Sequence, residues 1–201
     1  MDPVTRRGRE TRHRIVEAAA RLMYRDGVAA TSVDHVLEEA GAGKSQFYHY
    51  FGSKDELVDA VLSFHAAGGE SEQAAILAEN PGWEGIRVWL DAVVAGQAGS
   101  RDARGCPIGS MAAELAERDP ALRSRLADAL ERKRIVLRER LQELLDAGAM
   151  SPDADPERLA TFTMAVLQGG LLFARTYGRQ ADLERTVDEA WVHLTSFRTS
   201  V

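Results

Sequence analysis

The 201-residue chain holds a single cysteine, Cys106, and so cannot form a disulfide within itself. A chain without disulfides fits a reducing compartment, and we expect a cytoplasmic protein. No apolar run approaches the roughly 20 residues that a membrane-spanning helix needs, so no membrane partner is expected. The N-terminal segment, MDPVTRRGRETRHR, is polar and basic with no hydrophobic stretch behind it, which does not fit a secretory signal.

Signatures of catalysis and of metal binding are also missing. The histidines, at positions 13, 35, 49, 65 and 193, lack the spacing of metal ligands, and no nucleophile elbow is present. Gly43-Lys44-Ser45 resembles the end of a phosphate-binding loop. That motif, however, needs a glycine where this chain has Glu38, and a strand in front of it. We therefore expect no catalytic residues, no cofactor and no metal.

The net charge of −6 is unevenly distributed along the chain. Residues 1–54 hold nine basic and seven acidic side chains, a net of +2, whereas the remainder holds 16 basic and 24 acidic ones, a net of −8. A basic end beside an acidic body suits a protein that touches phosphate at one end only. An ordinary solvated helix with an arginine-rich start would give the same count.

Apolar residues recur at helical spacing in nearly every segment, and no stretch alternates like a strand, which predicts an all-α fold. Glycine stops and Asp-Pro starts, such as Asp155-Pro156, mark the helix ends. The segment 68–82, which contains Gly68-Gly69, is predicted to be a joint. About nine helices are expected: 10–26, from Thr31 or Ser32 to 40, 44–50, 53–67, 83–98, 107–117, 120–147, 156–177 and 182–198.

Residues 31–54 have the layout of a helix-turn-helix DNA reader. Gly41 and Gly43 permit a tight turn between two short helices. The second helix offers polar groups near its start, where such a helix meets base edges: Lys44, Ser45, Gln46 and His49. Side chains better placed to hold phosphates are Thr31, Tyr48, Tyr50 and Lys54.

The span from about 10 to 57 resembles the DNA-binding domain of the TetR family of transcriptional regulators. The similarity rests on RIVEAAARLMYRDGVAATSV, on EEAGAGKSQFYHYFGSKDEL and on the spacing between them. A weaker similarity covers GCPIGSMAAELAERDPALRSRL, residues 105–126, which looks like a segment of some ligand-binding domains of that family.

The resemblance implies an all-α homodimer. Residues 1–52 would form a three-helix DNA-binding domain, and 53–201 a helical ligand-binding and dimerisation domain. Ser45, Gln46, Tyr48, His49 and Lys54 would contact DNA, and Thr31 and Ser32 would anchor a phosphate. The expected function is that of a repressor, bound to a near-palindromic double-stranded operator and released by a small-molecule effector.

Two groups of residues on the later helices are candidates for the effector site and the dimer contact. Apolar side chains with a few polar ones suit a ligand cavity, although core packing is the commoner role of each such residue taken singly: Trp89, Cys106, Met111, Leu115, Phe162, Gln168 and Leu172. Small and apolar residues could build a four-helix dimer contact, or pack within one subunit: Gly169, Gly170, Ala174, Leu183, Val187, Trp191 and Leu194.

Cys106 has two interpretations. It precedes Pro107 at the start of an expected helix, where the helix dipole would stabilise a thiolate that senses oxidants or electrophiles. A small buried core residue is the alternative. For the whole chain, an enzyme built on the helical body and a protein-binding adaptor remain the rival functions.

Overall fold

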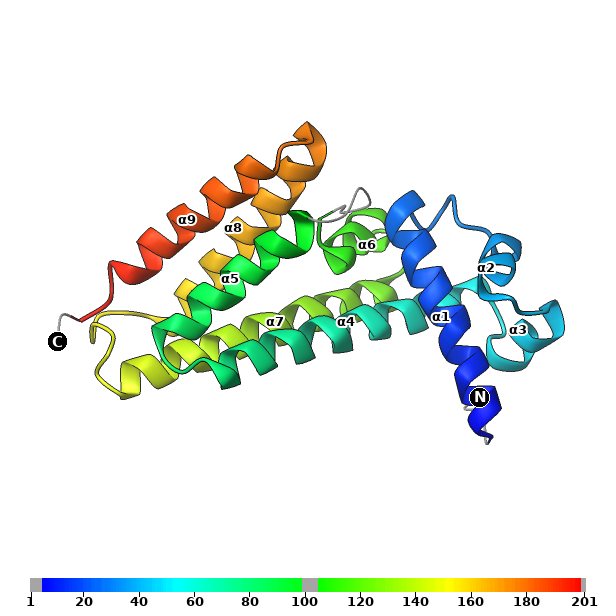
Figure 1. Ribbon diagram of the computed structural model, residues 1–201, viewed down its shortest axis with the longest axis horizontal. Helices are drawn as coiled ribbons and strands as arrows, with labels where there is room; N and C mark the ends of the chain where they lie inside the picture. Colours follow the sequence, from blue (N-terminus) through cyan, green and yellow to red (C-terminus); the bar gives the residue numbers. More distant parts are fainter. Residues whose placement is uncertain (1–4, 99–104, 200–201) are drawn as a thin grey trace. The chain divides into compact units, whose positions relative to one another are not determined.

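A computed structural model describes residues 5–98 and 105–199 (Figure 1). The described residues form nine helices and no strand, so the predicted all-α fold is confirmed. The helices are α1 (Arg6–Asp26), α2 (Val33–Ala40), α3 (Lys44–Tyr50), α4 (Lys54–Glu79), α5 (Trp83–Ala98), α6 (Pro107–Leu115), α7 (Pro120–Asp146), α8 (Pro156–Tyr177) and α9 (Gln180–Thr195). None of the described helices is long and apolar enough to cross a membrane.

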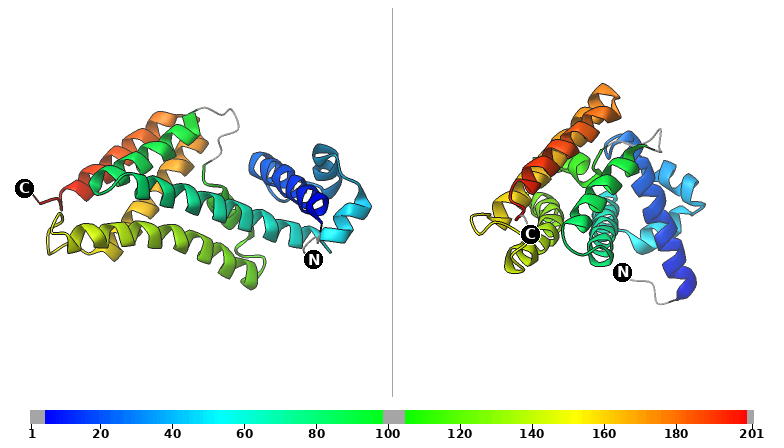
Figure 2. Two further views of the ribbon diagram at one scale, coloured as in Figure 1. Left: turned by 60° about the horizontal axis from the view of Figure 1, so that its bottom comes forward. Right: turned by 60° about the vertical axis from the view of Figure 1, so that its left-hand side comes forward.

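The predicted joint at 68–82 is wrong, because α4 continues through both glycines to Glu79. Beyond the glycines this helix packs against α7, where Gln73 is 1% exposed and donates from Nε2 to the Lys133 carbonyl at 3.2 Å. Leu77 is also buried. Figure 2 shows α4 and α7 side by side. Packing of this kind overrides the low helix propensity of glycine.

The chain separates into two compact units by its contacts. The first, here called the head, comprises residues 1–67 and 110–129; the second, the body, comprises 68–109 and 130–201. The boundary falls inside α4, α6 and α7, so these three helices contribute residues to both units. The head therefore extends beyond the 1–52 segment that was predicted as a domain.

The head is built on a small apolar core. Ile15 of α1, Val36 of α2 and Leu57 of α4 are fully buried, and Phe47 of α3 is 1% exposed. Fully burying a side chain of this size stabilises the fold by roughly 1.5–3 kcal/mol. The core fixes α1, α2 and α3 against the start of α4.

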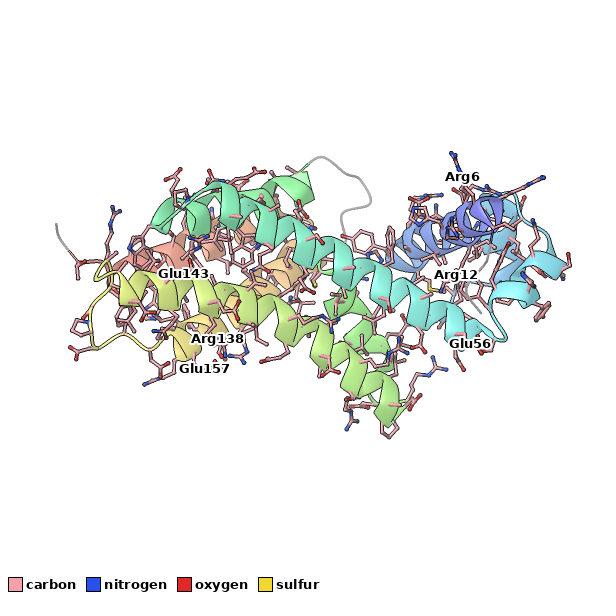
Figure 3. The ribbon with its side chains drawn as sticks, turned by 90° about the horizontal axis from the view of Figure 1, so that it is seen from below. Arg6, Arg12, Glu56, Arg138, Glu143 and Glu157 are labelled. Carbon is pink, nitrogen blue, oxygen red and sulfur yellow. The ribbon has the colours of Figure 1, made fainter. Side chains whose placement is uncertain are left out.

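The body is held together mainly by α8 against α9, with α5 packed on α9 (Figure 1). Asp155 caps α8 by accepting hydrogen bonds from the N–H groups of Glu157 and Arg158, as the Asp-Pro pair predicted. Trp83 of α5 contacts Trp191 of α9 edge to face, with ring centroids 6.2 Å apart. Glu157, labelled in Figure 3, pairs with Arg134 and so ties α8 to α7.

Helices α8 and α9 pack tightly against each other at Gly170. A Cβ atom there would lie 2.9 Å from Thr186 Cγ2 and 3.1 Å from Leu183 Cδ1, which is too close without a shift of α9. Gly96 of α5 is a helical glycine with nothing within 4 Å of the same position.

We predict that Gly170→Ala lowers the free energy of unfolding by about 1–2 kcal/mol, because overpacking outweighs the gain in helix propensity. Gly96→Ala is the matched control, which gains propensity without a clash. Thermal or urea unfolding at one fixed protein concentration measures both. Equal effects of the two substitutions would contradict the tight contact.

Candidate nucleic-acid interface

The turn between α2 and α3 is set by one glycine in a left-handed conformation. Gly41 has φ 59° and ψ 41°, and its N–H donates to the carbonyls of Glu38 and Leu37. No atom lies within 4 Å of a Cβ built there, so the backbone conformation, not space, requires glycine. Ser32 caps the other end of α2 by accepting the His35 N–H at 3.1 Å. The turn predicted from Gly41 is therefore present.

Helix α3 has one buried side and one exposed side. Phe47 and Tyr50 point into the head, at 1% and 9% exposure. Tyr48 is 67% exposed. The outward side, here called the recognition face, consists of five exposed polar or aromatic residues: Lys44, Ser45, Gln46, Tyr48 and His49. It presents hydrogen-bonding groups over the first turns of a short helix, which is what a major groove accepts.

Two residues of the recognition face already have partners in the head. Lys44 pairs with Asp34 of α2 at 3.0 Å, and the pKa of Lys44 is raised chiefly by its hydrogen bond to that carboxylate. Gln46 Oε1 accepts the Gly43 N–H at 2.9 Å. The Gln46 amide NH₂ is thus the group of this side chain that can bind a base edge. Lys44 has to break its ion pair with Asp34 before it can bind DNA.

Three residues predicted to hold phosphates are engaged elsewhere. Thr31 is 1% exposed and donates from Oγ1 to the Gly27 carbonyl at 2.7 Å, and Tyr50 lies on the buried side of α3. Lys54 Nζ donates to the Val28 carbonyl at 2.6 Å. As corrections, Thr31 and Tyr50 stabilise the head from within. Lys54 braces the loop after α1, and its phosphate contact stays a prediction. Ser32 remains exposed.

Three arginines of α1 form a basic edge beside the turn that sequence reasoning did not single out. Arg6, Arg7 and Arg14 line a groove of about 680 Å³ together with Gly41 and Gln46. Arg14 Nε donates to the Ala40 carbonyl at 3.5 Å. The helical spacing of Arg7 and Arg14, seven residues apart, could have indicated a shared face. This basic edge extends the charged surface next to the recognition face.

A carboxylate from α6 fixes the loop between α1 and α2. Glu114 accepts the Val28 N–H at 2.9 Å and the Ala29 N–H at 2.6 Å, just after Gly27 with φ 89°. We call this arrangement the loop clamp. Hydrogen bonds to a charged acceptor are about twice as strong as neutral ones. Glu114 is more than 80 residues from its partners in sequence, and no local signal pointed to it.

Comparison with known proteins assigns the family. A family model described as the bacterial regulatory proteins of the tetR family matches residues 15–61, and one described as the tetracyclin repressor-like C-terminal domain matches residues 82–190. The chain belongs to the TetR family of transcriptional regulators. The TetR-like helix-turn-helix is thus the DNA-binding part of a transcriptional regulator, as the residues 10–57 predicted.

Known transcriptional regulators are similar to this protein in sequence or structure along most of the chain. A helix-turn-helix transcriptional regulator of Mycobacterium tuberculosis is 30% identical over 169 residues, 82% of this chain and 84% of that protein. The crystal structure of a TetR regulator from Chloroflexus aurantiacus is similar with a TM-score of 0.86 and 27% identity, covering 98% of this chain and 100% of the other. The regulator CifR, solved with a 26-base-pair operator DNA, shares the fold at a TM-score of 0.80 and 23% identity, over 90% and 95% of the two chains.

The residues predicted to line an effector cavity have different surroundings in the structure. Trp89 is buried in the body core and Cys106 packs against the same core. Gln168 reaches toward α6, since its Oε1 would lie 2.6 Å from a Cβ at Gly109. As a correction, Phe162 and Leu172 are 39% and 58% exposed on α8 and do not line an interior cavity. The other two candidates, Met111 and Leu115, are buried residues that group with the head.

Most of the predicted dimer-contact residues pack inside the TetR-like body instead. Leu183, Val187 and Leu194 of α9 are at most 1% exposed, and Gly170 is buried against α9. Trp191 contacts Trp83 within the same core. As a correction, these five residues make an intramolecular contact. Gly169 differs because nothing lies within 4 Å of its Cβ position, and Ala174 is half-buried.

The loop clamp generates a local prediction. Glu114→Ala removes both acceptors, and we expect the head to lose about 2 kcal/mol of stability and the Val28 and Ala29 amide protons to exchange faster. Glu114→Gln should have a smaller effect. Glu117→Ala, at an exposed glutamate three residues away, is the matched control. Amide hydrogen exchange followed by NMR measures the effect, and unchanged exchange in Glu114→Ala would refute the clamp.

Proposed function

We propose that this TetR-family protein is a repressor that binds a near-palindromic double-stranded operator as a homodimer and is released by a small-molecule effector. The recognition face carries the proposal, because five exposed residues lie together on the second helix of a helix-turn-helix. Two such helices placed about 34 Å apart would enter successive major grooves. CifR, a regulator with the same fold, was solved in complex with a double-stranded operator, which supports DNA binding.

The roles within the interface follow from the geometry. Ser45, Gln46 Nε2 and His49 would contact base edges, whereas Tyr48 and Ser32 would contact phosphates. Lys44 would exchange Asp34 for the DNA. The basic edge at Arg6, Arg7 and Arg14 would neutralise further phosphates, so binding should weaken steeply with rising salt, because the release of counterions from DNA then gains less entropy.

We predict that His49→Ala weakens operator binding by roughly tenfold to a hundredfold and relaxes preference at one base position. Arg7→Gln should weaken binding to all sequences alike and make the salt dependence shallower. Gln142→Ala, at an exposed position of α7, is the control. Fluorescence anisotropy on an operator selected from random oligonucleotides measures these affinities. His49→Ala binding as tightly as the control would contradict the assignment.

An exposed apolar stripe on α8 is the proposed dimer contact. Phe162, Phe173 and Tyr177 are 39%, 51% and 56% exposed and recur at helical spacing with Gly169 between them. Leu172 is 58% exposed, and Val192 of the neighbouring α9 is 62% exposed. Apolar groups gathered in this way mark an interaction surface, and Gly169 would allow a second helix to approach closely.

We predict that Phe173→Glu converts the protein to a monomer, because it places a charge in the centre of this stripe. Glu79→Lys, a charge change at an exposed position of α4, is the control and should leave the dimer intact. Analytical ultracentrifugation at micromolar concentration measures both. A dimeric Phe173→Glu variant would place the contact elsewhere.

The effector is proposed to act from the body. Trp89, Cys106 and Gln168 are the remaining candidates for contacts with it, and a sensing role for the Cys106 thiol stays a prediction. An effector can change DNA affinity only by the difference between its own affinities for the DNA-binding and the released state of the protein. This difference is typically about 1–3 kcal/mol. The helices α4, α6 and α7 contribute residues to both units, so they would couple effector binding in the body to the DNA-binding helices of the head.

A further inference from the structure

The head contains another groove besides the one lined by Arg6, Arg7 and Arg14. A groove of about 1090 Å³ lies between α1, the end of α3, α4 and the start of α7. Its apolar walls come from Val16, Tyr50, Phe51, Ala60 and Phe64. Grooves of this size with mostly apolar and aromatic walls are large enough for a small organic molecule. We call it the head groove.

Arg12 on α1 contributes a positively charged guanidinium to the head groove. Its Nε is buried and meets no hydrogen-bond acceptor among the described residues. The guanidinium lies over the Phe51 ring, 5.2 Å from the centroid. A buried donor without an acceptor costs stability unless something supplies one. Figure 3 labels Arg12, on α1, and Glu56, on the first turn of α4; both residues line the groove.

The acidic residues around the groove are already engaged. Glu56 Oε2 accepts the Gly52 N–H at 2.9 Å, Asp59 pairs with Arg125, and Glu10 pairs with Arg6 at 2.8 Å. These carboxylates therefore do not satisfy the buried Arg12 Nε. An anion that enters the groove would complement the charge of Arg12.

We propose that the head groove binds an organic anion with a flat apolar body, namely an aromatic carboxylate. The carboxylate accepts hydrogen bonds from the Arg12 guanidinium, whose planar fork matches it. The ring system lies among Phe51, Phe64 and Val16. This site is separate from the effector site proposed for the body, and it does not depend on the DNA-binding proposal.

The test uses the full-length protein with methyl-labelled alanine and valine, titrated with 2-naphthoate and followed by NMR. The Val16 and Ala60 methyl signals should shift on binding. The neutral analogue 2-naphthamide should bind at least roughly tenfold more weakly, because it lacks the charge that pairs with Arg12. Neither measurement needs a variant or DNA.

Variants sharpen the test. Arg12→Gln should lower the affinity for 2-naphthoate by roughly tenfold or more. Ala60→Phe should block the groove while leaving Arg12 in place. Arg185→Gln, at an exposed arginine of α9, is the control and should bind as the unaltered protein does. Two-dimensional spectra of each variant report whether the head is folded.

Three results would overturn the proposal. Methyl shifts confined to the body would place the anion elsewhere. Equal affinity for the carboxylate and the amide would remove the role of Arg12. If the Val16 and Ala60 methyl signals shift with protein concentration in the absence of 2-naphthoate, a second copy of the chain occupies the groove.

Discussion

The burial of Phe47 determines which side of α3 faces the solvent. Phe47 is 1% exposed in the head core, and Tyr50, one helical turn further on, is buried on the same side. With these two rings inside, Lys44, Ser45, Gln46, Tyr48 and His49 have to point outward. The positive φ of Gly41 supplies the sharp turn that brings α3 into this position. Every proposed DNA contact on α3 depends on that orientation.

The head is stabilised at its loops by charged groups as well as by its core. Glu114 accepts two successive N–H groups after α1, and Lys54 donates to the carbonyl between them. Lys54, which is also predicted to hold a phosphate, belongs to this arrangement. The loop before α2, and with it the Ser32 cap, is therefore fixed by residues of α4 and α6.

Local signals predicted the fold well because they act between neighbouring residues. The Asp155 cap, the Gly41 turn and the α3 boundaries all follow from interactions within a few positions. The inward position of Tyr50 could have been predicted too, since residues three apart share a helix face. The continuous α4 could not, because Gln73 and Leu77 are ordered by packing that no adjacent residue signals.

The sites in the body were harder to predict for a different reason. Helix α8 is apolar on most of its circumference, so composition does not separate the buried Leu167 and Leu171 from the exposed Leu172 and Phe173. The buried and the exposed apolar residues of α8 both recur at helical spacing. Only the position of α9 decides which of them is covered. For the same reason Gly170 and Gly169, adjacent in sequence, have opposite surroundings.

The most direct test of the recognition face is chemical footprinting of the protein on a selected operator with dimethyl sulfate, which methylates guanine N7 in the major groove. The account predicts protection of N7 positions in two half-sites, with centres about one helical turn apart. Protection confined to minor-groove positions, or to a single half-site at saturation, would contradict a pair of α3 helices that read successive major grooves.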